Sequence, residues 1–154
     1  MNSPRLRLFC ATAAIAFGFT AAAGASTPAG RYLTTAGTAY DTKTKLTWQR
    51  GSSSSTLTWA DAKTYCANAG TSLGGAGWRL PTVKELLTLV DYSQAPTGTT
   101  AMVDSVAFPA TPLAFFWTSS PAPGNSGIAW MASLTYGAAD VINVAAPFNV
   151  RCVR

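Results

Sequence analysis

Few residues in this 154-residue sequence can do acid–base or metal chemistry. Histidine is absent, which removes the commonest general base and the commonest metal ligand. The carboxylates Asp91 and Asp104 bracket a long irregular stretch, and a pair of carboxyl groups there could act as acid and base. Nothing in the sequence brings these two side chains together, however. We therefore expect a protein that is not an enzyme and that needs no cofactor.

Three other carboxylates are assigned to local structure by their spacing. Asp61 stands three residues after Thr58, and Glu85 stands three residues after Thr82. This spacing is typical of capping pairs, in which the side chains satisfy free backbone groups at the start of a helix. Asp41 begins a predicted turn between two short strands. These carboxylates are accordingly expected to stabilise the fold rather than to react.

Residues 1–25 predict a signal peptide. Two arginines precede a short apolar stretch, and the small residues Ala-Gly-Ala at 23–25 are typical of a cleavage site. The apolar stretch is too short and too rich in alanine to span a membrane comfortably. We expect residues 26–30 to be a flexible leader and residues 31–154 to form a single exported domain. This domain would be periplasmic or extracellular and would have no transmembrane segment after cleavage.

Export changes what the charge and the cysteines imply. Without the two arginines of the signal peptide, the formal net charge falls from +5 to +3, and no lysine or arginine run remains. These features argue against a nucleic-acid partner. The three cysteines become two, Cys66 and Cys152, in a compartment where disulfides persist. Because a metal site on two cysteines would need further ligands, we predict a disulfide between them and no metal.

Two helices are predicted in the middle of the chain, on either side of the glycine-rich residues 70–77. The first begins at Thr58 and places Cys66 on its inner face. The second lies within residues 78–91, where Pro81 makes its start sharp. Apolar residues at i, i+3, i+4 and i+7 form one stripe on this helix, namely Val83, Leu86, Leu87 and Val90. Such a stripe must pack against other elements, and we expect a β body.

Short strands are predicted on both sides of these helices. Residues 31–33, 38–40 and 45–49 come before them, and the chain has the pattern of strands from residue 114 to its end. Residues 92–112 connect the second helix to the later strands and show no strong period. Long irregular loops often carry binding surfaces, so this loop is the first place to look for one.

The last predicted strand supports the disulfide. Phe148, Val150 and Cys152 alternate with Asn149 and Arg151, so Cys152 is expected to face the core, as Cys66 does. The five tryptophans lie inside periodic segments and predict core positions. In contrast, the serine-rich stretch before the first helix predicts a solvated connection.

The order of these elements resembles the C-type lectin-like fold. More specifically, the sequence resembles the C-terminal domain of the Legionella collagen-like adhesin in the segments YDTKTKLTWQR (40–50), LTWADAKTYCANA (57–69), GWRLPTVKELLTLVD (77–91), FWTSSP (116–121) and VRCVR (150–154). The resemblance implies an α+β fold with two helices packed on a small, mostly antiparallel sheet and a long irregular loop. One departure is Lys45, at a turn where the family more often has glycine.

The resemblance implies binding rather than catalysis. The adhesin domain is associated with sulfated glycans, and a net charge of +3 permits an anionic partner. We expect the binding face to include the 92–112 loop and the 121–127 turn, with contacts from Tyr92, Asn125, Tyr136, Asn143, Lys43 and Lys45. The alternative is a structural or protein-interaction module of the bacterial envelope that has no glycan ligand.

Other activities of this fold find little support in the sequence. Calcium-dependent lectins use acidic and amide triplets, to which Gln94-Ala95-Pro96 is only superficially similar, in a loop that is nearly free of acids. The distantly related sulfatase-activating enzymes need reactive cysteines, and both cysteines are already allocated to the predicted disulfide. Arg79 and Arg151 could hold an anionic ligand, but we favour buried or capping contacts that fix the fold.

Overall fold

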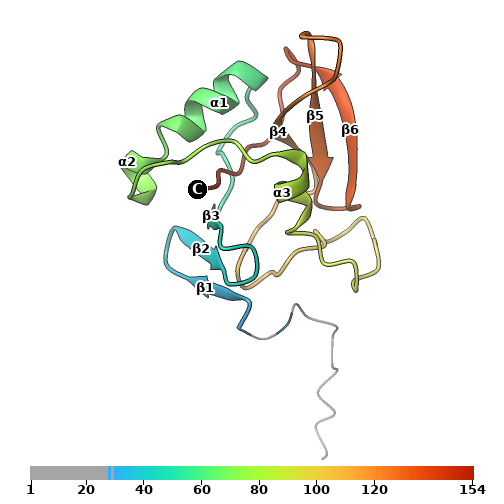
Figure 1. Ribbon diagram of the computed structural model, residues 1–154. Helices are drawn as coiled ribbons and strands as arrows, with labels where there is room; N and C mark the ends of the chain where they lie inside the picture. The colour runs from blue at the N-terminus through green and yellow to red at the C-terminus, as the bar shows by residue number, and fades with distance from the viewer. Residues whose placement is uncertain (1–27, 29) are drawn as a thin grey trace, which may run out of the picture.

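The computed structural model describes residue 28 and residues 30–154, and these form an α+β fold (Figure 1). The expected signal peptide, residues 1–25, lies outside the described residues, as does most of the expected leader, residues 26–30. No helix in the described part is both long enough and apolar enough to cross a membrane.

The described strands form two small antiparallel sheets, whereas the sequence predicts one. The first sheet has the order β1 (Tyr32–Thr34), β2 (Thr38–Asp41), β3 (Thr47–Gln49), and the second has the order β4 (Phe115–Pro121), β5 (Ile128–Ser133), β6 (Ala138–Asn143). Between the sheets in sequence come α1 (Trp59–Ala67), α2 (Gly70–Leu73) and α3 (Val83–Leu87). Figure 1 shows α3 between the two sheets, beside the β4–β6 sheet.

The predicted final strand is not a strand of either sheet. Instead, residues 148–154 make isolated bridges to both halves of the molecule, namely Leu57 with Phe148, Trp48 with Val153, Arg79 with Val153 and Phe116 with Asn149. The last residues before Arg154 therefore lie in the interior, next to β3 and the helices, and Arg154 itself is exposed (Figure 1). We call residues 148–154 the central segment.

Two core clusters lie on opposite sides of the central segment. Val150 and Cys152 belong to the cluster around Trp78 and Trp117, and Val153 belongs to the cluster around Trp48. The predicted alternation placed Arg151 on an outer face of this segment. Because the second cluster covers that face, Arg151 is buried too. Trp48, Trp78 and Trp117 are core residues as predicted, whereas Trp59 and Trp130 are partly exposed.

The predicted disulfide is confirmed. Cys66 on α1 is bonded to Cys152 on the central segment, with 5.3 Å between the two Cα atoms, and both residues are fully buried. Thr58 caps α1 by accepting a hydrogen bond from the backbone N–H of Asp61, again as predicted. The cap sets where α1 begins, and the helical spacing then brings Cys66 to the inner face.

The start of α3 also follows the prediction, but its length does not. Thr82 and Glu85 form the predicted capping box, and Glu85 additionally accepts two hydrogen bonds from Arg79, at 2.7 and 2.8 Å. Arg79 thus has the capping role favoured above. The helix ends after five residues, yet Leu89 and Val90 beyond it are buried. The apolar stripe therefore continues into a turn instead of a longer helix.

Two stretches predicted to be loops contribute more structure than expected. Residues 70–73 form the short helix α2 before the chain reaches Gly74, whose φ of +74° ends it. Within the serine-rich residues 51–56, Ser53 is buried and exchanges backbone and side-chain hydrogen bonds with Val150. The prediction of a wholly solvated connection was wrong at this serine, because the central segment needs its hydroxyl as an acceptor.

Removal of the disulfide should lower the stability by about 4–5 kcal/mol, because the bond closes a long loop and restricts the unfolded chain. The sequence separation of its cysteines is 86. The test is urea unfolding of the oxidised protein with and without reductant, beside a Cys66→Ala/Cys152→Ala variant. Equal stability of the oxidised and reduced proteins would contradict the prediction.

The Arg79–Glu85 pair should make stability depend on pH in the acid range. The hydrogen bonds from Arg79 lower the pKa of Glu85 from 4.5 to about 2, against the opposing effect of burial. A carboxyl group whose pKa is lower in the folded state stabilises the protein above its unfolded pKa and loses this effect as the pH falls through the folded pKa. We expect Glu85→Gln to cost about 1–2 kcal/mol at pH 6.

This difference between wild type and Glu85→Gln should shrink as the pH falls from about 5 to about 2, as measured by urea unfolding at each pH. Lys84→Gln, at the neighbouring exposed position, is the control and should not show this pH dependence. A cost for Glu85→Gln that stays constant over the whole range would refute the assignment.

Candidate functional site

Two exposed tyrosines lie together where β5 turns into β6. Tyr92 and Tyr136 expose 65% and 58% of their surface, although they come from different parts of the chain. The hydroxyl of Tyr92 donates a hydrogen bond to the backbone carbonyl of Gly137 at 2.9 Å. The hydroxyl of Tyr136 lies over Gly98, where an added Cβ would be 3.2 Å away. The structure thus brings together two of the residues predicted to bind a ligand.

Gly137 makes this arrangement possible. Its φ is +65°, a conformation that glycine adopts without steric cost. A Cβ at this position would also lie 2.6 Å from Cε1 of Tyr92, which is closer than atoms can approach. The ring of Tyr92 therefore packs directly on the backbone of the β5–β6 turn, and its position is fixed by that contact.

A hollow of about 270 Å³ lies in the same loop region. Its lining consists of hydroxyl-bearing and apolar side chains with no charged residue: Thr99, Thr100, Ala101, Val103, Ser105, Phe108, Ala110, Thr111 and Leu113. Gly98, under Tyr136, directly precedes this lining in sequence. Hydroxyl groups can donate and accept hydrogen bonds, and exposed aromatic rings offer flat apolar surface. This surface is suited to a neutral ligand rich in hydroxyl groups.

The 92–112 loop is only partly a surface. Met102, Val103, Ala107 and Phe108 are buried in the core cluster around Trp48, and the N–H of Met102 donates to the carbonyl of Leu134. The loop folds inward because these apolar residues complete the core, whereas Ser105 and Val106 between them are exposed. Only part of the loop is therefore available to the expected binding face.

Asn125 and Asn143 lie at the opposite end of the β4–β6 sheet from the tyrosines. Ile128 pairs with Asn143 at one end of the β5–β6 ladder, and Ser133 pairs with Ala138 at the other. Each asparagine side chain accepts a hydrogen bond from a nearby backbone N–H, that of Gly127 and that of Ala145 respectively. Their carbonyl oxygens therefore shape turns, and these residues do not adjoin the tyrosine surface.

Lys43 and Lys45 are exposed in the turn between β2 and β3. This turn is held by Asp41, whose carboxylate accepts from the backbone N–H of Lys43 and from Arg31. Burial raises the pKa of Asp41, but these hydrogen bonds outweigh it and the net pKa is lowered. Arg31 also donates to the carbonyl of Thr88, so the lysine turn is tied to the end of α3. The six predicted ligand residues therefore occupy three separate places.

A larger groove, of about 520 Å³, runs along α1 and α2. Its lining mixes polar and apolar side chains and comprises Leu57, Asp61, Thr64, Tyr65, Asn68, Ala69, Thr71 and Ser72. Only the inner face of α1, which carries Cys66, was predicted from the sequence, and the groove on its outer face was not. The i, i+3, i+7 spacing of Asp61, Thr64 and Asn68 on the outer face was the available signal.

The described carboxylates give little basis for a metal centre. No group of three or more His, Cys, Asp or Glu residues within residue 28 and residues 30–154 could hold a metal ion. Asp104 accepts hydrogen bonds from the backbone N–H groups of Val106 and Ala107, and Asp91 accepts from Ser93 and Gln94. Both carboxylates thus organise the loop that they bracket.

Comparison with known protein families agrees with this architecture. The family model of the Lcl C-terminal domain matches residues 37–154, which include strands β2 to β6, the helices and the central segment, but not β1. The chain belongs to this family. No curated protein matches the sequence significantly. The match confirms the resemblance found in the sequence and includes both cysteines of the disulfide.

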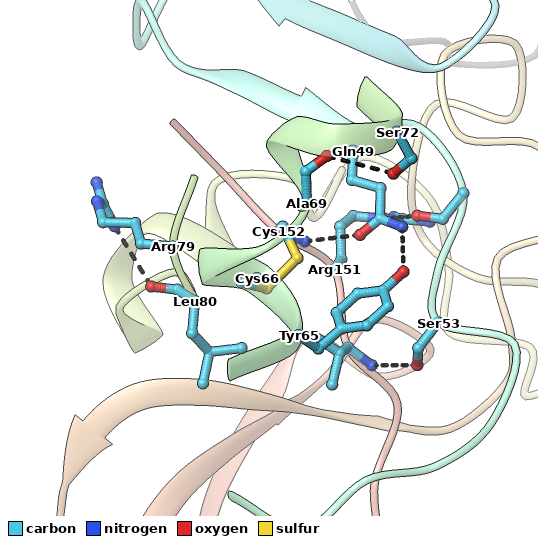
Figure 2. Close-up of a disulfide and its surroundings, with 12 residues drawn as sticks. Gln49, Ser53, Tyr65, Cys66, Ala69, Ser72, Arg79, Leu80, Arg151 and Cys152 are labelled. Atoms are coloured by element: carbon cyan, nitrogen blue, oxygen red, sulfur yellow. Dashed lines mark hydrogen bonds between the residues drawn. A yellow bond between two sulfur atoms is a disulfide. The ribbon is translucent and has the colours of Figure 1, made fainter. Parts of the chain in front are cut away.

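Polar side chains that the sequence analysis missed hold the central segment of this Lcl C-terminal domain in place. The amide of Gln49 accepts from the backbone N–H of Cys152 at 3.1 Å and donates to the hydroxyl of Tyr65 at 2.8 Å (Figure 2). Ser53 accepts from the N–H of Val150 nearby. Gln49 therefore links α1 to the central segment beside the disulfide, a role that no sequence motif indicates.

Lysine at position 45, where the family more often has glycine, has a direct effect on the backbone of the turn. Lys45 has a φ of +64°, in the left-handed region that glycine tolerates best. A left-handed conformation costs a residue with a Cβ roughly 1–2 kcal/mol. The glycine found more often in the family would remove this strain.

We therefore expect Lys45→Gly to raise the free energy of unfolding of this Lcl C-terminal domain by about 0.5–1 kcal/mol, since glycine also loses more backbone entropy on folding. Urea unfolding at neutral pH measures the change. Lys43→Gly is the matched control, because Lys43 is not among the residues with positive φ, and it should not be stabilising. If Lys45→Gly is destabilising, the turn is not strained.

Proposed function

We propose that this Lcl C-terminal domain is an exported, non-catalytic domain that binds glycans through the surface around Tyr92 and Tyr136. The observation that carries the proposal is the pair of exposed rings, of which Tyr92 is fixed on the turn at Gly137 and Tyr136 lies over Gly98, the residue that precedes a hollow lined by apolar and hydroxyl-bearing side chains. Sugar rings present apolar C–H faces and many hydroxyl groups. Fixed aromatic rings and neutral hydrogen-bonding groups complement both features at little cost in side-chain ordering.

The arrangement of the chain supports a C-type lectin-like fold. A disulfide joins the first helix to the last segment, and the β4–β6 sheet follows a long loop. β3 and the chain end are also hydrogen-bonded, because the N–H of Thr47 donates to the carbonyl of Arg154 and the reverse bond forms as well. The first sheet is therefore joined to the last residues of the chain, and the long loop connects α3 to β4.

The disulfide also supports export. Disulfides persist in oxidising compartments and are rare where thiols are kept reduced. A buried structural bond between the only two cysteines outside the expected signal peptide fits a periplasmic or extracellular domain.

A binding role without catalysis is supported by the use that the structure makes of its reactive groups. The chain has no histidine, and Asp41 and Glu85 are paired with Arg31 and Arg79. A carboxylate held by an arginine and by backbone N–H groups is stabilised in its ionised form and is a weak general base.

For an anionic glycan, the turn with Lys43 and Lys45 would supply the positive charge that the tyrosine surface lacks. Lys43 and Lys45 are exposed, and their turn is tied through Arg31 to Thr88, a few residues before Tyr92. An extended chain bound at the tyrosines could therefore reach the lysines with sulfate groups. Because these lysines are exposed, their contribution should weaken as the salt concentration rises.

The proposal is tested on a glycan array with the wild type and with Tyr92→Ala and Tyr136→Ala variants. Each substitution should weaken binding at least about tenfold, since each removes one flat contact surface from the site. Asn125→Ala is the matched control and should bind normally, because Asn125 lies at the other end of the sheet. Thermal unfolding of each variant shows whether the fold is retained. No binding of the wild type to any neutral or sulfated glycan would reject the proposal.

The groove along α1 and α2 favours a second function, an envelope module that contacts another protein. The groove is the larger of the two hollows, at about 520 Å³, and is remote in sequence from the tyrosine surface. A stable protein partner should remain bound in a pull-down from envelope extract when heparin is added. Asn68→Arg, in the groove lining, should abolish that capture but leave glycan binding unchanged.

A further inference from the structure

Arg151 is a fully buried arginine in the centre of the molecule. Its guanidinium group donates hydrogen bonds to the carbonyl of Gly51 at 3.2 Å, the carbonyl of Arg50 at 3.4 Å and the hydroxyl of Thr111 at 3.0 Å. It also lies over the rings of Phe108 and Phe116, with its central carbon 4.8 and 5.6 Å from the ring centres. Every one of these contacts is electrically neutral.

No carboxylate of the described residues forms an ion pair with Arg151. The ion pairs in this part of the chain are Arg31–Asp41 and Arg79–Glu85. One nitrogen of Arg151, Nη1, is buried and has no hydrogen-bond partner. Burial lowers the pKa of Arg151 to about 9, because its buried surroundings disfavour the charged form of the guanidinium group. A buried charge normally needs a partner of opposite sign.

A second buried donor without a partner lies beside the same aromatic ring. The hydroxyl of Tyr32 is buried and makes no hydrogen bond, and the ring of Tyr32 packs edge-on against Phe108, with 5.0 Å between ring centres. Two buried donors with no acceptor thus lie around Phe108. The charged residues near Tyr32 are Arg31 and Asp104, which line the same hollow, and Asp41, which is paired with Arg31.

Two surface hollows approach this region from different sides. Tyr32 and Ala107 line a hollow of about 170 Å³, and Phe108 and Thr111 line the hollow of about 270 Å³. Residues that contact the buried donors therefore reach the protein surface on both sides.

We propose that Arg151 is the centre of an internal binding site for a small inorganic anion of the halide class, with Nη1 of Arg151 and the hydroxyl of Tyr32 as donors. A halide requires only donors, has no protons to place and neutralises one positive charge. Both free donors and the uncompensated guanidinium charge are then satisfied by one ligand. Phe108 and Thr111 contact Arg151 and also line the hollow of the glycan surface proposed above, but the test of the anion site uses no glycan.

The test is the thermal unfolding of the folded domain in sodium chloride and in sodium gluconate at equal ionic strength. Because a ligand of the folded state stabilises by mass action, the wild-type Tm should rise in chloride by about 3–8 °C for each tenfold increase above the dissociation constant. Bromide should act in the same way. Lys84→Met removes an exposed positive charge and, as the matched control, should keep the full response.

Two variants separate a halide from general salt effects. Arg151→Met should abolish the difference between chloride and gluconate, and Tyr32→Phe, which keeps the ring, should raise the chloride concentration needed for half the effect severalfold. Tyr32→Phe serves as the deciding variant if Arg151→Met does not fold. In crystals grown with bromide, an anomalous peak should lie within hydrogen-bond distance of Nη1 of Arg151.

The proposal is overturned if the wild type has the same Tm in chloride and gluconate. It is also overturned if Tyr32→Phe responds to chloride like the wild type, or if the crystals show a water molecule and no bromide at Arg151. The first result would mean that the neutral acceptors and aromatic rings are sufficient for the guanidinium group. The last would mean that only its hydrogen bonds, not its charge, need a partner.

Discussion

The fold depends on the central segment, residues 148–154, in which Val150 to Val153 are buried on both faces. This central segment is hydrogen-bonded to the chain between β3 and α1 on one side, and to Arg79 and the start of β4 on the other. The two small sheets share no strand, so the segment is what joins them. The Cys66–Cys152 bond then holds α1 against it. A long loop closed by a covalent bond restricts the unfolded chain most effectively, which compensates for sheets of only three strands.

The same burial explains the unusual polar residues of the interior. A backbone segment in the core must have its N–H and C=O groups satisfied, and the side chains of Gln49 and Ser53 complete what the neighbouring backbone does not supply. Arg151 is buried for a related reason. The residues on either side of it face one core cluster, so its side chain enters the other, among Phe108 and Phe116. The guanidinium group of Arg151 is buried because core clusters cover both sides of the segment at this position.

The long loop shows how one stretch can serve both the core and the surface. Met102, Val103 and Phe108 fill the cluster around Trp48, and this anchors the loop at its centre. Val103 and Phe108 also line the hollow together with exposed hydroxyl-bearing residues of the loop, and Gly98 lies under the hydroxyl of Tyr136. An anchored loop reduces the cost of ordering the binding surface proposed above.

Local features of the fold were determined by the sequence alone. The caps at Thr58 and Thr82 depend on contacts within four residues, and the inward direction of Cys66 follows from helical spacing, so these were predicted correctly and the family with them. Buried or capping contacts were also favoured for Arg151, which is buried. Only the tertiary structure decided the division into two sheets, the burial of Ser53, and the grouping of Tyr92 with Tyr136 apart from Asn125 and Asn143. Each of these is a contact between residues far apart in sequence. Alternation can say that two sides of a strand differ, but it cannot say that both sides will be covered. That depends on which elements pack against them, and the chain settles this only when it folds.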